Sequence, residues 1–273
     1  MTSHQDVIRD QFTKQSVAFS SALAIRNEEA LKLLLELTNA SSSDTVLDVA
    51  CGPGIVACAF AEVVAHTTGI DLTPAMIEQA RTLQAERRLA NMAWRVGDIV
   101  PLPYADGSFS IVTSRYAFHH LQDPQAALGE MHRVCKGGGQ IVLIDQVASA
   151  NPKQADALNR MERLRDPSHV RALTLAEMQG LYAGVGLRNP RMTSYRLAVE
   201  LDTLLKGSFP NEGDAEMVRR MVMDSLEDDG MNVGTRRVNG QIWISYPIAI
   251  LMAEKRASGV RKAQSDNSRE RTR

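Results

Sequence analysis

Acidic residues stand at the ends of three short apolar segments that are typical of β-strands, at Asp48, Asp71 and Asp98. A turn that contains Gly52 and Gly54 follows the first segment and leads into a helix. Glycine lets the backbone approach a ligand closely, and the free N–H groups of a helix N-terminus attract a negative group. Carboxylates after the second and third strands can accept hydrogen bonds from ribose hydroxyls and from an adenine amino group. The pattern predicts a site for an adenine nucleotide or an adenosyl compound.

The glycine turn by itself leaves the ligand open. Residues 52–57 also match the G-x-G-x-x-G/A fingerprint of dinucleotide-binding proteins, and a tight strand-to-helix turn needs no ligand at all. The three acids, however, come at the carboxyl ends of neighbouring strands. Parallel α/β sheets bind ligands at this edge, beside the point where the strand order reverses. Three acids in register therefore favour a ligand site over a plain turn.

Short apolar strands alternate with helices from residue 45 onward. Strands are expected at 45–50, 67–71, 93–98, 109–116 and 140–147, and helices at 54–65, 74–90 and from Asp123 to the glycines at 137–139. Later helices are expected at 152–165, 174–183 and within 202–240, with strands within 188–201 and at 240–256. This alternation predicts an α/β fold with a doubly wound, Rossmann-like sheet. We expect seven mostly parallel strands, an antiparallel edge strand and a helical cap.

The composition excludes several classes of protein. Of the 273 residues, 44% are apolar and 23% are charged, and 31 basic residues balance 32 acidic ones. The net charge of −1 gives no general basic field for a nucleic acid or an anionic membrane. No apolar run could span a bilayer and the N-terminus lacks a signal-peptide core, so we expect a cytoplasmic protein. The three cysteines lack metal-ligand spacing, which favours reduced thiols and argues against a metal site.

Four segments together resemble the ordered motifs of class I S-adenosylmethionine-dependent methyltransferases: VLDVACGPG (46–54), GIDLTPAMIEQA (69–80), GDIVPLPYADGSFS (97–110) and FHHLQDPQAALGEMHRVCKGGG (118–139). The chain is most similar to the type 11 group, which is related to the ubiquinone and menaquinone biosynthesis enzymes. The likeness is close from about residue 45 to 148 and looser in the N-terminal arm and up to about 190. It implies S-adenosyl-L-methionine as the methyl donor and S-adenosyl-L-homocysteine as the product.

The resemblance also implies a role for each matching residue. The methionine moiety would be held by Asp48, Ala50, Gly52 and Gly54, with Asp48 serving the ammonium group directly or through water. The adenosine would be held by Asp71 at the ribose and by Leu72, Met76, Asp98 and the Ile99 backbone at the adenine. The sulfonium end would be lined by Ser114 and Arg115.

The N-terminal arm contains the segment QFTKQSVAF (11–19), which resembles the lid that closes over the cofactor in this group. The resemblance indicates Phe12, Gln15 and Phe19 as lid residues. An amphipathic helix that merely packs on the domain is an equal alternative for the two phenylalanines.

A histidine pair, His119 and His120, follows the fourth expected strand. The end of this strand lies near the transferred methyl group, and an imidazole with an ordinary pKa of about 6.5 suits proton removal there. Adjacent loop residues usually diverge, so we expect His119 to face the pocket beside Tyr116 and Arg115, and His120 to pack. The alternative is that both histidines are structural.

The segment RDPSHVR (165–171) offers a second source of catalytic residues, from the cap. His169 could reach the same space as the histidine pair, and Arg165 could serve the substrate or the lid. The alternative is a turn with solvated arginines, because Asp-Pro-Ser is good turn chemistry.

The expected domain organisation has five parts: 1–26 a lid arm, 27–150 the cofactor-binding core, 151–240 a substrate cap and sheet-edge insertion, 241–256 the final core strand, and 257–273 a disordered tail. We expect in-line methyl transfer to a small, partly apolar metabolite in a closed pocket, with no nucleic-acid or membrane partner. A homodimer is compatible with the sequence.

Two rival functions remain. An NAD-dependent oxidoreductase would use the glycine turn and Asp71, but it leaves Asp98 unexplained, and no Tyr-x-x-x-Lys pair is present to polarise a carbonyl. The other is a catalytically inactive regulator that binds an adenosyl ligand.

Overall fold

The computed structural model describes residues 3–21 and 27–257. The helices are α1 (His4–Ser21), α3 (Glu28–Thr38), α4 (Ile55–Ala61), α5 (Pro74–Glu86), the 3-10 helix η1 (Phe118–His120), α6 (Pro124–Val134), α7 (Pro152–Arg165), α8 (Leu175–Gly184), α9 (Leu201–Ser208) and α10 (Asp214–Asp228). The strands are β1 (Thr45–Val49), β2 (His66–Asp71), β3 (Met92–Val96), β4 (Phe109–Arg115), β5 (Cys135–Ala148), β6 (Leu173–Thr174), β7 (Arg191–Glu200), β8 (Arg236–Val238) and β9 (Gln241–Glu254). The predicted disordered tail lies outside the described residues from 258 onward.

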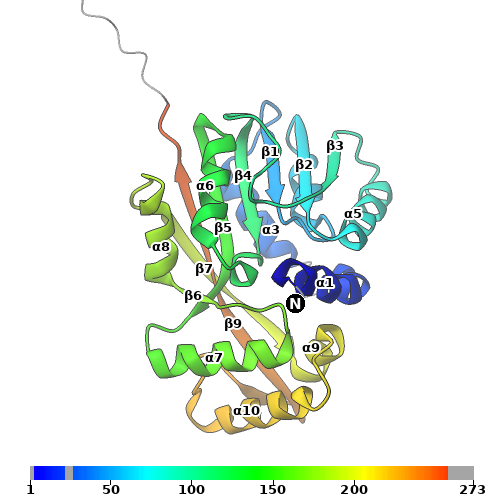
Figure 1. The fold of residues 1–273 in the computed structure, drawn as a ribbon, viewed down its shortest axis with the longest axis vertical. Coiled ribbons are helices and arrows are strands. Elements are labelled where there is room, and N and C mark those ends of the chain that lie inside the picture. The colour runs from blue at the N-terminus through cyan, green and yellow to red at the C-terminus, as the bar shows by residue number, and fades with distance from the viewer. Residues whose placement is uncertain (1–2, 22–26, 258–273) are drawn as a thin grey trace, which may run out of the picture.

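One twisted sheet runs through the molecule, with its main strands in the order β3-β2-β1-β4-β5-β9-β7 (Figure 1). Strands β1 to β5 pair in parallel, and β9 runs antiparallel to both β5 and β7. The predicted mostly parallel Rossmann-like sheet is confirmed, with seven strands on its main path and the short strands β6 and β8 added beside β5 and β9. Strand β9 lies between β5 and β7, so β7 is the edge strand on this side of the sheet. The strand order reverses between β1 and β4, where such sheets bind ligands.

Strand residues alternate between two buried cores, one on each face of the sheet. Val46, Ile111 and Val142 belong to the core beneath α3 and α4, whereas Leu47 and Val112 belong to the core beneath α6 and α8. This period of two in strands that are apolar on both faces is what a sheet covered by helices on both sides requires.

The cap continues the sheet and is not a separate globule. Strands β5 and β9 are both 14 residues long, and their far ends carry α7, α9 and α10 (Figure 1). Helix α1 lies between this cap and the parallel core, near the carboxyl ends of the strands (Figure 1). The arm therefore sits where a ligand of the core and a substrate held by the cap would meet.

Helix boundaries follow the capping chemistry of the sequence. The side chains of Asn27 and Asp123 accept hydrogen bonds from backbone N–H groups in the first turns of α3 and α6. One expectation was wrong: the glycines at 137–139 lie inside β5 and do not end α6. Gly139 is needed there because a Cβ atom would meet the Ser110 carbonyl oxygen at 2.7 Å.

Within the described ranges, no helix combines the length and the apolar character that crossing a membrane requires.

Candidate functional site

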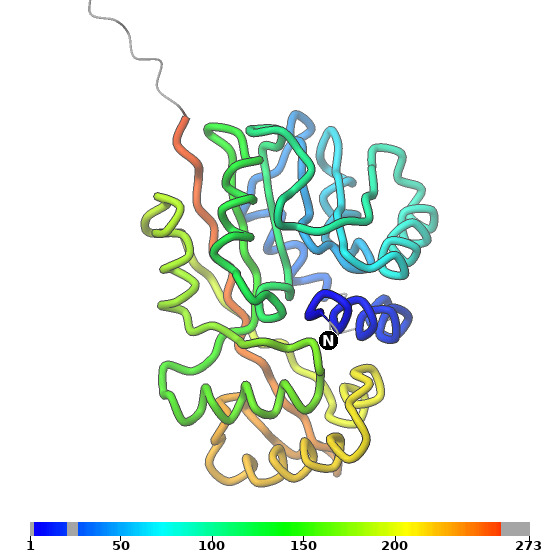
Figure 2. Tube along the Cα trace, in the orientation of Figure 1, coloured from blue at the N-terminus to red at the C-terminus, as the bar shows by residue number. Residues whose placement is uncertain are grey.

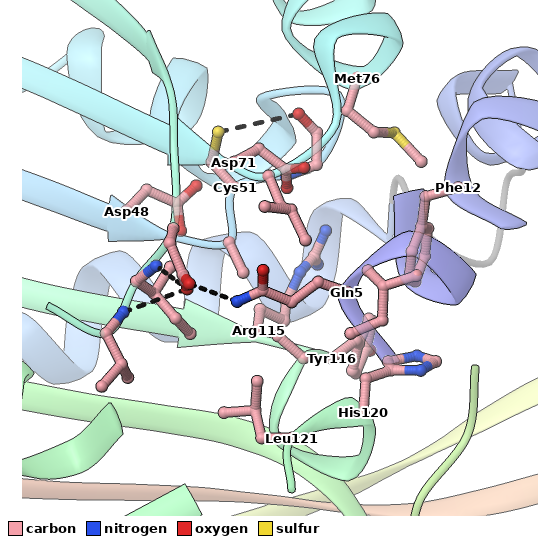
Figure 3. Close-up of a pocket in the computed structure, with 18 of the residues that line it drawn as sticks. Gln5, Phe12, Asp48, Cys51, Asp71, Met76, Arg115, Tyr116, His120 and Leu121 are labelled. Atoms are coloured by element: carbon pink, nitrogen blue, oxygen red, sulfur yellow. Dashed lines mark hydrogen bonds between the residues drawn. The ribbon is translucent and has the colours of Figure 1, made fainter. Parts of the chain in front are cut away.

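A cavity of about 300 Å³ opens at the carboxyl ends of β1, β2 and β4, beneath α1. Its walls hold most of the residues that the resemblance assigned to the cofactor: Phe12, Phe19, Asp48, Ala50, Gly52, Asp71, Leu72, Met76, Asp98, Ile99 and Arg115. In Figure 3, Asp71 and Met76 lie on one side, His120 and Leu121 on the other, and Gln5 and Phe12 extend from α1 between them. Segments that are far apart in the sequence thus meet around one space.

Hydrogen bonds to two buried carboxylates fix the conformation of the turn after β1 and the start of α4. Asp71 accepts from the backbone N–H groups of Gly52 and Thr73, each at 2.8 Å, and Asp48 accepts from that of Ala57 at 3.1 Å. Ala50 has a φ of +54° and Gly52 one of +52°, so the turn uses the left-handed region twice in three residues. These contacts aim both carboxylates at the cavity edge and leave acceptor capacity on each.

Burial sets the ionisation of the two carboxylates. It raises the pKa of Asp48 to about 7, although the positive charge of Arg115 opposes the shift. It also raises the pKa of Asp71, against the hydrogen bonds from Thr73 and Gly52. A cationic or hydrogen-bond-donating ligand would stabilise the charged form of both groups.

Asp98 is occupied by the arm. Its carboxylate accepts from the side-chain amide of Gln5, which Figure 3 labels, and from the backbone N–H of Ile99 at 2.6 Å. An amide NH₂ and the amino group of adenine are similar donors. Gln5 therefore uses the acceptor that the resemblance assigned to adenine.

Three residues predicted to bind the cofactor, Gly54, Gln15 and Ser114, do not line the cavity. Gly54 is a packing glycine, because a Cβ atom there would lie 2.6 Å from Trp94. Gln15 donates to Asp166 at 3.0 Å and so faces the cap. The Ser114 side chain is fully buried, since strand alternation turns it away from the wall to which Arg115 contributes.

The predicted orientation of the histidine pair was wrong. His120 lines the cavity and His119 does not. His119 is held inside by Asp145 of β5, with Nδ1 at 2.6 Å from one carboxylate oxygen and the backbone N–H at 3.1 Å from the other. The short 3-10 turn places the two rings 4.2 Å apart, between the core and the cap.

Tyr116 lines the cavity as expected, in the left-handed region with a φ of +58°. Its hydroxyl, however, hydrogen-bonds to that of Tyr195 on β7, and burial raises the pKa of Tyr116. His169 lies away from the cavity wall, 5.5 Å from the His119 ring, with Nε2 at 2.9 Å from the Asn159 side chain. The Tyr116 hydroxyl is therefore engaged by Tyr195, and the His169 ring by Asn159.

Several wall residues were not predicted from the sequence, among them His4, Gln5, Ile8 and Cys51. The signal for two of them is helical spacing, since positions 5, 8, 12 and 19 fall on one stripe of α1. Starting from Phe12, this spacing leads directly to Ile8 and Gln5.

The comparisons with known proteins agree with this geometry. Residues 47–143 match the family described as a methyltransferase domain. An uncharacterized methyltransferase of Bacillus subtilis, YcgJ, is 31% identical over 231 residues, covering 84% of this chain and 91% of the relative. The chain belongs to the methyltransferase family. It is an S-adenosylmethionine-dependent methyltransferase of the class I, type 11 group.

Solved structures of other methyltransferases extend the likeness to the fold. The crystal structure of YcgJ has a TM-score of 0.75 at 30% identity and covers 84% of this methyltransferase and 99% of that chain. A geranyl diphosphate C-methyltransferase of Streptomyces coelicolor has a TM-score of 0.60 over 84% of this chain and 78% of its own, at 16% identity, so it shows the fold alone.

Several sequence relatives are named for their reaction. The ubiquinone/menaquinone biosynthesis C-methyltransferase UbiE of a Ruegeria species is 34% identical to this methyltransferase. The match covers 37% of this chain and 41% of that relative. The likeness is therefore limited to less than half of either protein.

Proposed function

We propose that this methyltransferase binds S-adenosylmethionine in the cavity beneath α1 and methylates a small, partly apolar metabolite. The observation that carries the proposal is that Asp48, Asp71 and Asp98 line one cavity, at or just beyond the carboxyl ends of β1, β2 and β3. When bound, the donor supplies a methyl group that is already activated on a sulfonium.

The residues fit such a ligand. Asp71 has both oxygens oriented by backbone donors and retains lone pairs for two ribose hydroxyls. Asp48 is a buried carboxylate whose charged form needs a cation, as the ammonium of the methionine moiety would provide. Gly52 has open space within 4 Å of the position of a Cβ atom, which leaves room for a close ligand.

The protein has mainly to align an acceptor and exclude water, because the methyl group is activated by the donor. Apolar side chains of α1 cover the cavity, including Ile8, Phe12 and Phe19. The cavity volume of about 300 Å³ would then limit the acceptor to a small molecule.

Isothermal calorimetry tests the proposal. We expect saturable binding of S-adenosylhomocysteine and none of NAD or NADH. The reverse result would favour an oxidoreductase. Methyl transfer to any member of a panel of small acceptors would contradict a purely regulatory role.

Cofactor affinity is expected to depend on pH through Asp48. Its pKa of about 7 in the free protein means that near pH 6 most molecules carry a neutral carboxyl. A ligand ammonium favours the carboxylate, so binding releases a proton below pH 7. Affinity for S-adenosylhomocysteine should therefore rise up to about tenfold from pH 6 to pH 8. Calorimetry in buffers of different ionisation enthalpy measures the proton release, which should disappear in Asp48→Asn. Equal proton release in the variant would contradict this role.

The arm is expected to become better protected when the cofactor binds. Helix α1 docks through a few contacts, such as those of Gln11 and Gln15 with the Ser208 carbonyl oxygen, so ligand contacts with Phe12 would add appreciably to its stability. Hydrogen exchange of the amides in α1 should slow on addition of S-adenosylhomocysteine, while exchange in α10, which contributes no residue to the cavity, stays constant. Protection of α1 that is already complete without ligand would contradict a lid.

A further inference from the structure

His120 is the cavity-facing end of a buried chain of hydrogen bonds that begins in the cap. Its Nδ1 lies 3.0 Å from the Ser168 hydroxyl oxygen, which lies 2.5 Å from a carboxylate oxygen of Asp166. All three residues are at most 5% exposed. In Figure 2, the segment that follows α7 passes beside α1, consistent with these contacts.

The direction of the chain follows from donor and acceptor counts. The pKa of Asp166 is held well below its usual range: burial opposes this shift, but His120, Arg165 and the hydrogen bonds of Ser168 and Gln15 outweigh it. Asp166 is therefore an acceptor only, and the single hydroxyl hydrogen of Ser168 must point to it. The Ser168 oxygen must then accept a hydrogen bond from Nδ1–H of His120. A neutral imidazole with its proton on Nδ1 carries its lone pair on Nε2.

Among the residues that the structure describes, no side chain or carbonyl hydrogen-bonds to Nε2 of His120. The two neighbouring histidines are engaged elsewhere, His119 with Asp145 and His169 with Asn159. Neither of these two residues lines the cavity, whereas His120 does. Nε2 of His120 is therefore the ring nitrogen of this cluster that belongs to a cavity residue and is not engaged by Asp145, Asn159 or Ser168.

Charged and titratable groups surround His120 on several elements: His4 of α1, Arg115 of β4, His119 of η1, Asp145 of β5, and Asp166 and His169 of the loop after α7. Burial, followed by the charge of His119, lowers the pKa of His120 to about 4. The ring is thus neutral near pH 7. Any imidazolium formed during a reaction would be stabilised by Asp166 through Ser168.

We propose that Nε2 of His120 accepts the proton of the methyl acceptor, and that Ser168 and Asp166 are positioning residues that fix its tautomer. This assignment rests on the proposed function. The electron pair left on the acceptor atom forms the new bond to the methyl carbon, and the electrons of the broken carbon–sulfur bond remain on the sulfur. The acceptor must then carry a weakly acidic proton on its reacting atom, as a phenol does.

The wall beside His120 suits a flat, partly apolar acceptor of this kind. The Phe12 ring packs edge-on against His120, with centroids 5.0 Å apart, and Tyr116 lines the same cavity. Helix α1 also hydrogen-bonds to the His120 carbonyl oxygen through His4 and to Asp166 through Gln15. Docking of the arm therefore orders both ends of the hydrogen-bond chain from His120 through Ser168 to Asp166.

The tautomer of His120 is directly measurable by long-range ¹H–¹⁵N correlation NMR on the full chain, with and without S-adenosylhomocysteine. Loss of signals in His120→Gln assigns the ring. We expect the Nδ1–H form from pH 6 to 8 in the wild type, and a shift toward Nε2–H in Ser168→Ala. Ser108→Ala, which removes an exposed loop hydroxyl, is the matched control and should change nothing. An Nε2–H ring in the wild type, or no change in Ser168→Ala, would contradict the proposal that Ser168 and Asp166 fix the tautomer of His120.

Two phenols separate a base from a merely structural residue. At about pH 8, phenol keeps its proton whereas 4-nitrophenol is largely ionised and needs no base. We expect His120→Gln to lower methylation of phenol by roughly 10²–10⁴-fold and that of 4-nitrophenol by a few-fold only. Equal losses would overturn the base role, and wild-type inactivity with both phenols would overturn the acceptor class. Calorimetry on the same samples separates these outcomes from failure of the proposed function, because His120→Gln should bind S-adenosylhomocysteine normally.

Discussion

Replacement of Asp71 by alanine is expected to weaken binding of S-adenosylhomocysteine at least tenfold, with the protein still folded. The carboxylate is positioned to accept hydrogen bonds from both ribose hydroxyls, and each charge-assisted bond contributes roughly 1.5–3 kcal/mol. The structure adds a second reason, because Asp71 also accepts from the backbone N–H groups of Gly52 and Thr73. The variant therefore loses ligand contacts and the order of the turn that forms the cavity wall.

The measurement is calorimetric titration, with circular dichroism to verify the fold. Asp106→Ala is a suitable control because it also removes an acid from a loop, one that is paired with Arg133 at 2.8 Å but 80% exposed. A surface ion pair contributes about 1 kcal/mol or less to stability, so the affinity of this control should equal that of the wild type. An unchanged dissociation constant in Asp71→Ala would remove Asp71 from the site.

The parallel core could be predicted from the sequence because its signals are local. Strand alternation, the capping residues Asn27 and Asp123, and acids at strand ends all act within a few residues of one another. Parallel pairing then brings the ends of β1, β2 and β3 to the same edge, which is why Asp48 and Asp71 line one cavity.

The orientation of the histidine pair could not be predicted in the same way. The partner that draws His119 inward, Asp145, is 26 residues away, and the Ser168 hydroxyl that holds His120 is 48 residues away. Either histidine could have faced the cavity if only the 3-10 turn were considered. Tertiary contacts with β5 and the cap determine which of the two rings faces the cavity.

Glu162→Gln is expected to destabilise the protein by about 3–5 kcal/mol, the usual cost of removing one member of a buried ion pair. Glu162 is 1% exposed and accepts from Arg165 at 2.8 Å and from the Tyr246 hydroxyl at 2.7 Å. A glutamine would leave the Arg165 guanidinium buried, with Asp166 at 3.9 Å as a weaker partner. Urea unfolding of the two proteins measures the difference.

Glu177→Gln is the matched control. Glu177 pairs with Arg171 at 2.7 Å, but its side chain is 41% exposed, and glutamine can replace glutamate in its capping box. This variant should lose about 1 kcal/mol or less. Equal effects of the two substitutions would mean that the buried pair contributes no more to the free energy of unfolding than the exposed pair does.

The pH dependence gives an independent check of the same pair. Burial would raise the pKa of Glu162, but the charge of Arg165 and the hydrogen bonds from Arg165 and Tyr246 outweigh it and lower the pKa below its ordinary 4.5. The unfolded chain therefore binds a proton at higher pH than the folded protein does. The contribution of the pair is complete above about pH 4.5 and is lost as the pH falls through the lower, folded-state pKa. In Glu162→Gln this part of the acid sensitivity should vanish, so the difference in stability between wild type and variant should narrow as the solution is acidified. A difference that stays constant down to the acid transition would mean that Glu162 contributes by shape and not by charge.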